Sequence, residues 1–216
     1  MVKFATFDCY GTLIDWKKGI SDSFKRIVGE MYPDDEIFKR YVNIEAKREG
    51  MYDSYRRILE MSFKDLAAIF GLKVTDFQAR QFAESITEWP GFNDSAPALK
   101  ELGKNGIKRI ILSNVDRDIL EKTITQANLE VDGFVTAEDV RSYKPNLAHW
   151  KYFFTNFNAS PENTVHIAGS IYHDIEPATK LGLKAIWVNR YGESSGDHGY
   201  KTISDLKSIA RILNEL

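Results

Sequence analysis

The sequence predicts an α/β fold, a doubly wound parallel sheet into which an all-helical subdomain is inserted. Two observations predict it. Beyond residue 90, short apolar runs alternate with segments whose apolar residues recur every three or four positions, as strands alternate with helices. Between residues 16 and 89 no strand pattern interrupts the helical periodicity. We therefore predict an α/β core of residues 1–15 and 90–216 and a helical insertion of residues 16–89.

The chain opens with a strand and then enters the helical insertion. Val2–Asp8 is mainly apolar, β-branched and aromatic, and Gly11 follows at once, so the chain turns sharply at the carboxyl end of a buried strand. Within the insertion, Pro33, Gly50 and Gly71 separate four helical segments. The predicted helices are Ser21–Tyr32, Asp35–Glu49, Tyr52–Phe70 and Thr75–Ile86.

Strands and helices alternate through the rest of the core. The predicted strands are Arg109–Leu112, Gly133–Thr136, Thr164–Ala168 and Lys184–Val188. The predicted helices are Ser95–Asn105, Asp116–Ala127, Leu147–Phe157 and Ile175–Leu181. We expect a polar loop at Gly192–Gly199 and an amphipathic closing helix at Ile203–Leu216. This alternation predicts parallel strands joined by right-handed crossovers, with helices on both faces.

Composition narrows the class of partner. The 216 residues carry a net charge of −2, so no overall positive field attracts nucleic acid or a membrane surface. The single cysteine, Cys9, excludes an internal disulfide and suggests a reducing compartment. No window approaches the roughly 20 apolar residues of a membrane span. We expect a cytoplasmic monomer or homodimer that takes a small anionic substrate.

Polar residues follow four of the predicted strands at the point where each strand ends. In open α/β sheets, ligands bind beyond the carboxyl ends of the strands. That rule selects Asp8–Thr12, Ser113–Asn114, Lys144 and Gly169–Asp174. Since these ends lie at one edge of a parallel sheet, the sequence predicts a single site built from all four segments.

Asp8 is the candidate nucleophile of this site. A carboxylate at the end of a buried strand is poorly solvated and aimed at the cleft. Carboxylates also act as nucleophiles and form esters that water later cleaves. Two alternatives stay open from the residues alone. Asp8 could instead cap the following turn, and Thr12 could bind Asp8, bind a substrate oxygen or stabilise that turn.

The remaining segments supply charge and hydrogen bonds. Ser113 and Asn114 can donate to an anionic substrate, and Lys144 can keep Asp8 ionised and neutralise developing charge. Asp174 can position Lys144 or a water molecule. Taken one at a time, Ser113 and Asn114 also fit an ordinary loop, and Lys144 fits a solvated loop lysine. Asp174 also fits the capping or first-turn acid of a helix.

In this order and spacing the four segments resemble the haloacid dehalogenase superfamily over nearly the whole chain. The motifs that carry the resemblance are Phe7–Leu13, Leu112–Asn114, Tyr143–Pro145 and Gly169–Asp174. The helical insertion after the first motif is similar to the helical cap of that superfamily, and the rest to its Rossmann-like core. The resemblance implies that Asp8 is the nucleophile, with Lys144 paired to it.

Most members of the superfamily are magnesium-dependent phosphatases, and this chain departs from their pattern. They carry a second Asp two residues after the nucleophile, where this chain has Tyr10. Their fourth motif is rich in carboxylates, whereas Ala168–Ser170 holds none and only Asp174 remains. Mg²⁺ usually takes carboxylates from the protein, so Asp8 and Asp174 would have to hold it alone.

The 2-haloacid dehalogenase branch fits better. It resembles this chain in Asp-x-Tyr-Gly-Thr-Leu, in Leu-Ser-Asn and in Ala185–Arg190. Halide needs no protonation to leave, so the reaction requires neither an acid at position 10 nor a metal. The resemblance implies dehalogenation through an ester on Asp8, with no cofactor. Substrate contacts are then expected at Tyr10, Thr12, Ser113, Asn114 and Ser170.

Departures from that branch leave two other functions open. Gly169 and Ile171 stand where such dehalogenases place a Ser and an Asn that help to activate water. We expect Ser170 or Tyr172 to take over that task. The cap arginine that would receive the halide is one of Arg40, Arg48, Arg56 and Arg57. The other cap charges are expected to be a solvated helical surface. The alternatives are a magnesium-dependent phosphatase with a degenerate metal site and a binding protein that has lost catalysis.

Overall fold

One parallel sheet organises the core. The structure, a computed structural model, describes residues 1–29, 31–48, 50–194 and 198–216. In this part of the chain six parallel strands pair in the order β3-β2-β1-β4-β5-β6. They are β1 (Phe4–Phe7), β2 (Lys108–Ser113), β3 (Gly133–Thr136), β4 (Thr164–Ala168), β5 (Lys184–Val188) and β6 (Lys201–Ile203). The predicted fold class is confirmed.

The strand order places Asp8 at the switch point of the sheet. The chain adds β2 and β3 on one side of β1 and then crosses to add β4, β5 and β6 on the other. Phe7 is in register with Ile111 on one neighbour and Ile167 on the other. The Asp8 backbone N–H donates to the Ile167 carbonyl at 3.1 Å. Ligand sites of open α/β sheets form where the order reverses in this way.

Ten α-helices are seen among the described residues, and the first four lie between β1 and Trp89. These four are α1 (Trp16–Val28), α2 (Asp34–Glu45), α3 (Tyr55–Ile69) and α4 (Asp76–Ser85). The others are α5 (Ser95–Lys104), α6 (Arg117–Gln126), α7 (Ala137–Val140), α8 (Ala148–Phe157), α9 (Glu176–Lys180) and α10 (Ile209–Asn214). A π-helical turn, Ile171–Ile175, leads into α9. The short helix α7 was not predicted.

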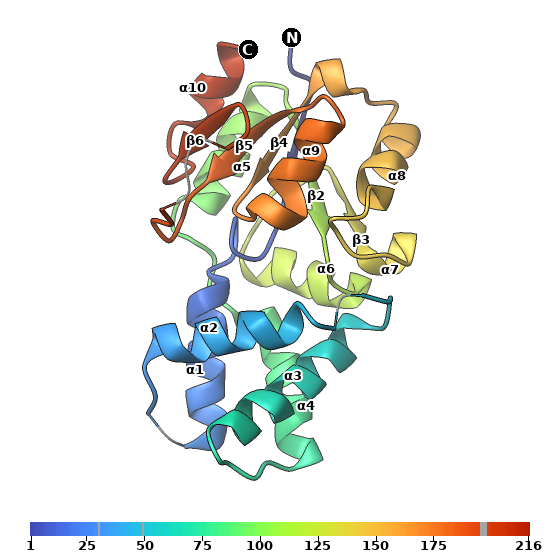
Figure 1. Cartoon of the computed structure of the whole chain (residues 1–216). Helices are drawn as coiled ribbons and strands as arrows, with labels where there is room; N and C mark the ends of the chain where they lie inside the picture. The colour runs from blue at the N-terminus through green and yellow to red at the C-terminus, as the bar shows by residue number, and fades with distance from the viewer. Residues whose placement is uncertain (30, 49, 195–197) are drawn as a thin grey trace.

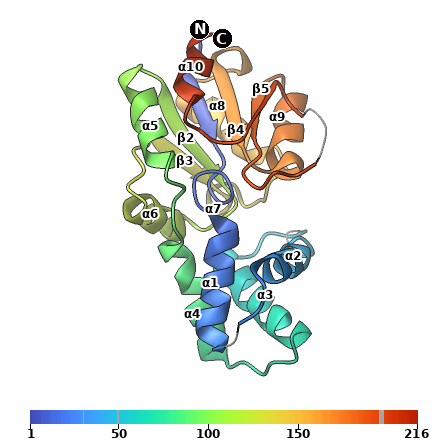
Figure 2. The same cartoon turned by 90° about the vertical axis from the view of Figure 1, so that its left-hand side faces the viewer.

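Helices cover both faces of the sheet. Successive side chains of a strand point to opposite faces, so each face has its own apolar core. Phe7 and Ile111 pack with α5, α6 and α10, whereas Leu112 and Trp187 pack with α8 and α9. Figure 2 shows α5 and α9 on opposite sides of the strands. This doubly wound arrangement fixes the sheet edge from which the site is built.

Helices α1 to α4 form a separate helical body beyond the carboxyl ends of the strands (Figure 1). We define this body, α1–α4, as the cap. The boundaries of the inserted subdomain, residues 16 and 89, stay a prediction. Helix α1 begins at Trp16 and not at Ser21, because Asp15 caps it by accepting from the Lys18 N–H at 3.1 Å. Helix α2 ends at Glu45, and residues 30 and 49 of the predicted helices lie outside the described residues.

The predicted closing helix is wrong at its start. Ile203 belongs to strand β6, and helix α10 covers only Ile209–Asn214. Strand β6 pairs with β5 in parallel, with Ile203 opposite Val188. That pairing satisfies backbone groups across a long stretch of sequence, which a local amphipathic pattern cannot reveal. The predicted polar loop Gly192–Gly199 includes 195–197, outside the described residues.

Hydrogen bonds from two core residues, Asp116 and Tyr143, help to hold the cap against the core. The carboxylate of Asp116, in the loop after β2, accepts from the backbone N–H groups of Tyr55 and Arg56, both at 3.0 Å. It therefore caps the N-terminus of α3 from the core side. The Tyr143 hydroxyl donates to the Asp53 carbonyl at 2.6 Å.

None of the described helices is both long and apolar enough to span a bilayer.

Close packing of α1 against Trp89 generates a stability prediction. A Cβ atom built on Gly19 would lie 2.2 Å from Cγ of Trp89, so Gly19→Ala must displace a buried indole. We expect a loss of about 1–3 kcal/mol in the free energy of unfolding, as for other overpacked cores. Gly50→Ala is the control, because nothing lies within 4 Å of its added Cβ. Urea titration of both variants measures the difference, and equal stability would contradict the packing argument.

Candidate active site

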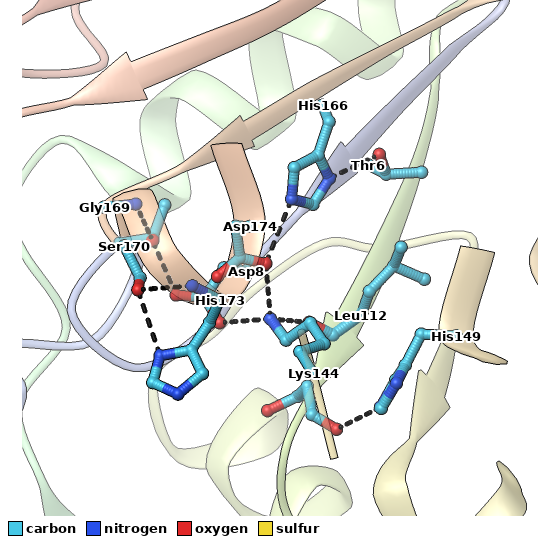
Figure 3. A network of polar contacts seen from close by, with 12 residues as sticks. Thr6, Asp8, Leu112, Lys144, His149, His166, Gly169, Ser170, His173 and Asp174 are labelled. Atoms are coloured by element: carbon cyan, nitrogen blue, oxygen red, sulfur yellow. Dashed lines mark hydrogen bonds and ion pairs between the residues drawn. The ribbon is translucent and has the colours of Figure 1, made fainter. Parts of the chain in front are cut away.

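Three charged side chains meet at the carboxyl edge of the sheet. The Lys144 ammonium donates to Asp8 Oδ1 at 2.9 Å, to Asp174 Oδ1 at 2.6 Å and to the Leu112 carbonyl at 2.8 Å. Figure 3 shows the lysine between the two carboxylates. Its side chain is 1% exposed. One buried cation thus bridges the ends of β1, β2 and the turn after β4.

Asn114 holds the backbone of Lys144. Its side-chain oxygen accepts from the Lys144 N–H at 2.7 Å, and its side-chain amide donates to the Lys144 carbonyl at 3.1 Å. These two bonds fix the lysine loop against the end of β2. The structure therefore places Asn114 in a positioning contact, while sequence reasoning expected it to bind substrate directly.

Electrostatic interactions shift the pKa values of the two carboxyl groups in opposite directions. Burial alone would raise the pKa of Asp174, but Lys144 and His166 outweigh it and lower that pKa to about 2. Burial raises the pKa of Asp8, and the attraction of Lys144 offsets it only in part. Burial opposes the charged form of Lys144, but its two carboxylate partners raise its pKa above the usual value. Asp174 is therefore the more acidic of the two carboxyl groups and Asp8, the candidate nucleophile, the more basic.

The Thr12 hydroxyl forms hydrogen bonds with both Asp8 and the fourth motif. Its hydroxyl donates to Asp8 Oδ2 at 2.8 Å and accepts from the Gly169 N–H at 2.8 Å. The Arg190 guanidinium donates to the Thr12 carbonyl through Nε at 3.1 Å and Nη2 at 2.8 Å. Thr12 is fully buried. It orients Asp8, which was one of the roles that the sequence left open.

Close backbone packing explains the glycine of the fourth motif. A Cβ on Gly169 would lie 2.6 Å from the Gly11 carbonyl oxygen and 3.4 Å from the Thr12 hydroxyl. Neither a serine nor an aspartate fits there without moving the turn that follows β1. Gly169 is therefore the residue that this backbone requires.

Asp174 has a second support that the sequence analysis missed. His166 Nε2 lies 3.1 Å from Asp174 Oδ1, and its Nδ1 lies 2.9 Å from the Thr6 hydroxyl. Nε2–H can donate to the carboxylate, and the Thr6 hydroxyl lies within hydrogen-bond distance of both Nδ1 and the Val165 carbonyl, the latter at 3.3 Å. Both residues are fully buried. A histidine within the otherwise apolar strand β4 was the available signal.

The charged cluster opens into a cavity of about 440 Å³ between core and cap. The predicted site residues that line it are Asp8, Tyr10, Ser113, Asn114, Lys144, Ser170 and Asp174. Its apolar wall includes Trp16, Phe38 and Val42. Thr12 lies behind the lining. A chamber of this size can take a ligand well beyond a few heavy atoms.

Two lining hydroxyls differ in availability. Among the described residues, the buried Ser113 Oγ has no hydrogen-bond partner, so it can bind a substrate. The Tyr10 hydroxyl is already bonded to the Thr123 hydroxyl at 2.7 Å. An edge-to-face contact with Trp89, with ring centroids 6.0 Å apart, further fixes Tyr10. Tyr10 therefore lines the cavity with its hydroxyl already engaged.

A serine–histidine pair stands beside the charged cluster. The Ser170 hydroxyl accepts from the His173 N–H at 3.1 Å and lies 3.1 Å from its Nδ1. If Ser170 donates to Nδ1, the ring proton sits on Nε2. Both residues line the cavity. Figure 3 shows the pair next to Asp8, on the side away from His149.

The candidate cap arginines are engaged elsewhere. Each forms an ion pair away from the cavity: Arg40 with Glu36, Arg48 with Asp65, Arg56 with Asp118 and Arg57 with Asp53. In the part of the chain that the structure describes, no arginine lines the cavity. The expected halide-binding arginine is therefore not brought to the site.

One cap acid is not on a solvated surface, contrary to expectation. Glu45 is 6% exposed and lines the cavity. Its Oε1 accepts from the hydroxyls of Tyr41 at 3.3 Å and Tyr55 at 2.5 Å. The helical spacing of Glu45 from Phe38 and Val42, both apolar, was the signal that could have found it.

The site fits Mg²⁺ poorly. No cluster of three or more Asp, Glu, His or Cys suited to a metal occurs among the described residues. Both Oδ1 atoms of Asp8 and Asp174 bind Lys144, and Asp8 Oδ2 accepts from Thr12. Only Asp174 Oδ2 has no partner in the described structure. Lys144 and Thr12 therefore already use three of the four carboxylate oxygens that these two residues could offer to Mg²⁺.

Comparison with known proteins agrees with this geometry. Residues 2–213 match the family model described as haloacid dehalogenase-like hydrolase. The chain is 22% identical to an (S)-2-haloacid dehalogenase of Pseudomonas fluorescens, covering 100% of this chain and 96% of that protein. It is 25% identical to the pyrophosphatase PpaX of Bacillus cereus, covering 85% and 81%. The structure of the L-2-haloacid dehalogenase from Xanthobacter autotrophicus superposes with a TM-score of 0.87 at 18% identity, covering all of both chains.

Removing the bridging cation should destabilise the fold. In Lys144→Met two buried carboxylates would face each other without compensation. We expect a loss of about 3–5 kcal/mol in the free energy of unfolding at neutral pH. Adding Asp174→Asn should recover part of the loss, because it removes one of the uncompensated charges. A double-mutant cycle by urea unfolding measures this, and strictly additive losses would refute the electrostatic explanation.

The lowered pKa of His149 should make the stability of the fold depend on pH. Burial, with Lys144 nearby, lowers the pKa of His149 to about 3, while Nε2 lies 3.1 Å from the Ser113 carbonyl. The unfolded chain takes up this proton near pH 6.5 and the folded chain only near pH 3. His149 should therefore cost stability, by about 1.4 kcal/mol per pH unit, as pH falls below 6.5. His149→Gln should flatten that slope in denaturant titrations from pH 7 to 5; an unchanged slope would contradict the prediction.

Proposed function

Because the chain belongs to the haloacid dehalogenase-like hydrolase family, we propose that it hydrolyses 2-haloacids through an ester on Asp8 and without a metal. The observation that carries this proposal is the fixed, cation-paired carboxylate of Asp8 at the base of a cavity. Tyr10 stands two residues later and supplies no acid for an alkoxide leaving group. A leaving halide needs none.

In the first step the Asp8 carboxylate attacks C2 of the substrate from the side opposite the halogen. A carbon–oxygen bond forms, the carbon–halogen bond breaks with its electron pair, and the configuration at C2 inverts. Thr12 and Lys144 hold the two carboxylate oxygens, so the nucleophile enters in one orientation. The Ser113 hydroxyl is the proposed contact for the substrate carboxylate, because all three N–H groups of Lys144 are already donated within the protein.

In the second step water attacks the ester carbonyl of Asp8. The acyl–oxygen bond breaks, a 2-hydroxy acid leaves, and the carboxylate is restored with release of one proton. Ser170 and His173 contact each other and line the cavity that Asp8 also lines, which supports a role near the ester. We assign the positioning of this water to the Ser170 hydroxyl, and Asn114 holds the lysine loop throughout.

A phosphatase is the second candidate, because PpaX is among the relatives and Asp174 Oδ2 is available. Two features weigh against it. No side chain fits at Gly169, where a metal-binding aspartate would stand, and Tyr10 cannot serve as the general acid. A binding protein that has lost catalysis would retain the same fold, and Asp8→Asn would leave its function intact.

Replacement of the nucleophile provides the decisive test. Wild-type protein should release chloride from (S)-2-chloropropionate equally with Mg²⁺ and with EDTA. Asp8→Asn should lower that rate by about 10³-fold or more, since the nucleophile itself is lost. Ion chromatography measures the chloride, and p-nitrophenyl phosphate is assayed in parallel. Metal-dependent phosphate release without chloride release would overturn the proposal in favour of a phosphatase.

Substitution in the fourth motif tests the second step. If Ser170 positions the hydrolytic water, Ser170→Ala should slow ester hydrolysis by about 10²-fold, leaving a burst of one chloride per site. Intact-protein mass spectrometry should then detect the accumulated ester on Asp8. Tyr172→Phe is the matched comparison, because its ring is 63% exposed at the cavity rim. Unchanged turnover in both variants would exclude either residue from this role.

A further inference from the structure

The wall of the cavity that faces the nucleophile has an unexpected charge. Phe38, Val42 and Glu45 of α2 and its C-cap residue Ala46 recur at positions i, i+4, i+7 and i+8, so they share one face of that helix. All four line the cavity. The cap therefore presents an apolar stripe interrupted by one carboxylate.

Two buried phenols hold the Glu45 carboxylate in place. Glu45 accepts from two phenols, those of Tyr41 and Tyr55, which are 0% and 5% exposed. Hydrogen bonds to a carboxylate favour its charged form and fix its direction. Glu45 is therefore a hydrogen-bond acceptor held in a fixed position on the cavity wall.

The charge balance of the cavity points the same way. The lining contains four carboxylates, those of Asp8, Glu45, Asp174 and Glu193, against one lysine. Lys144 already donates to two of them. A substrate with a second anionic group at the cap end would be repelled, whereas a donor there would be attracted.

We propose that Glu45 is a specificity-determining residue that binds a hydrogen-bond donor, an amine or a hydroxyl, at the far end of an elongated substrate. The reacting carbon lies at Asp8, an apolar body fills the chamber beside Trp16 and Phe38, and the donor reaches Glu45. This inference rests on the proposed reaction at Asp8 for its reacting end. The donor contact itself depends only on the cavity.

Matched 2-chloro acids test it by turnover. 2-Chlorohexanoate, its 6-hydroxy and 6-amino derivatives and 2-chlorohexanedioate differ only at the far end. We expect the donor-bearing acids to exceed 2-chlorohexanoate in kcat/KM by about 10- to 100-fold, the effect of one charge-assisted hydrogen bond. The dicarboxylate should be the poorest. A larger gain for the amine than for the hydroxyl would identify a cationic substrate.

Variants separate recognition from structure. Glu45→Gln should abolish the preference for the amine over 2-chlorohexanoate. Glu36→Gln, on the exposed side of the same helix, should retain that preference. If Glu45→Gln lowers all four substrates by the same factor, Glu45 only joins α2 to α3 and the inference is wrong.

Binding measurements keep the two proposals distinct. Calorimetry with hexanoate, 6-aminohexanoate and hexanedioate requires no turnover. If no chloro acid releases chloride but 6-aminohexanoate binds wild type about tenfold tighter than it binds Glu45→Gln, the reaction fails and the inference stands. If chloride is released but neither assay shows a preference that depends on Glu45, the reaction stands and the inference fails.

Discussion

The site depends on one buried ammonium group. Lys144 lies between Asp8 and Asp174 and also donates to the end of β2, so three strand ends are tied together through a single charge. Buried carboxylates are costly without a partner, and removing the cation leaves both uncompensated. The asymmetry between the carboxylates arises from the same contact, since His166 additionally stabilises Asp174 and leaves Asp8 the more basic of the two.

Close packing restricts which side chain the fourth motif can carry at position 169. Gly169 lies so close to the Gly11 carbonyl that no side chain fits, and its N–H supports the Thr12 hydroxyl that orients Asp8. The departure from both the phosphatase and the dehalogenase patterns at this position therefore follows from packing between two loops. Water activation, in our proposal, then passes to Ser170, one residue along.

The cap provides a wall of the cavity and, in our proposal, the group that selects the substrate. Asp116 holds the N-terminus of α3 from the core, and α2 then lies across the carboxyl edge of the sheet (Figure 1). The stripe containing Glu45 thus lines the same cavity as Asp8, while the four candidate arginines form ion pairs away from it. In our proposal the reaction and the specificity therefore come from different parts of the chain.

The sequence by itself determined the fold class, the family and the candidate reacting groups. Strand ends of a parallel sheet share one edge, so residues as distant as Asp8, Lys144 and Asp174 could be placed together from periodicity alone. Tertiary structure decided the rest. The pairing of β6 with β5, the His166 contact, the use of Asn114 on the lysine backbone and the burial of Glu45 all depend on neighbours far away in sequence. Local patterns carry no information about such contacts, because packing between elements sets them.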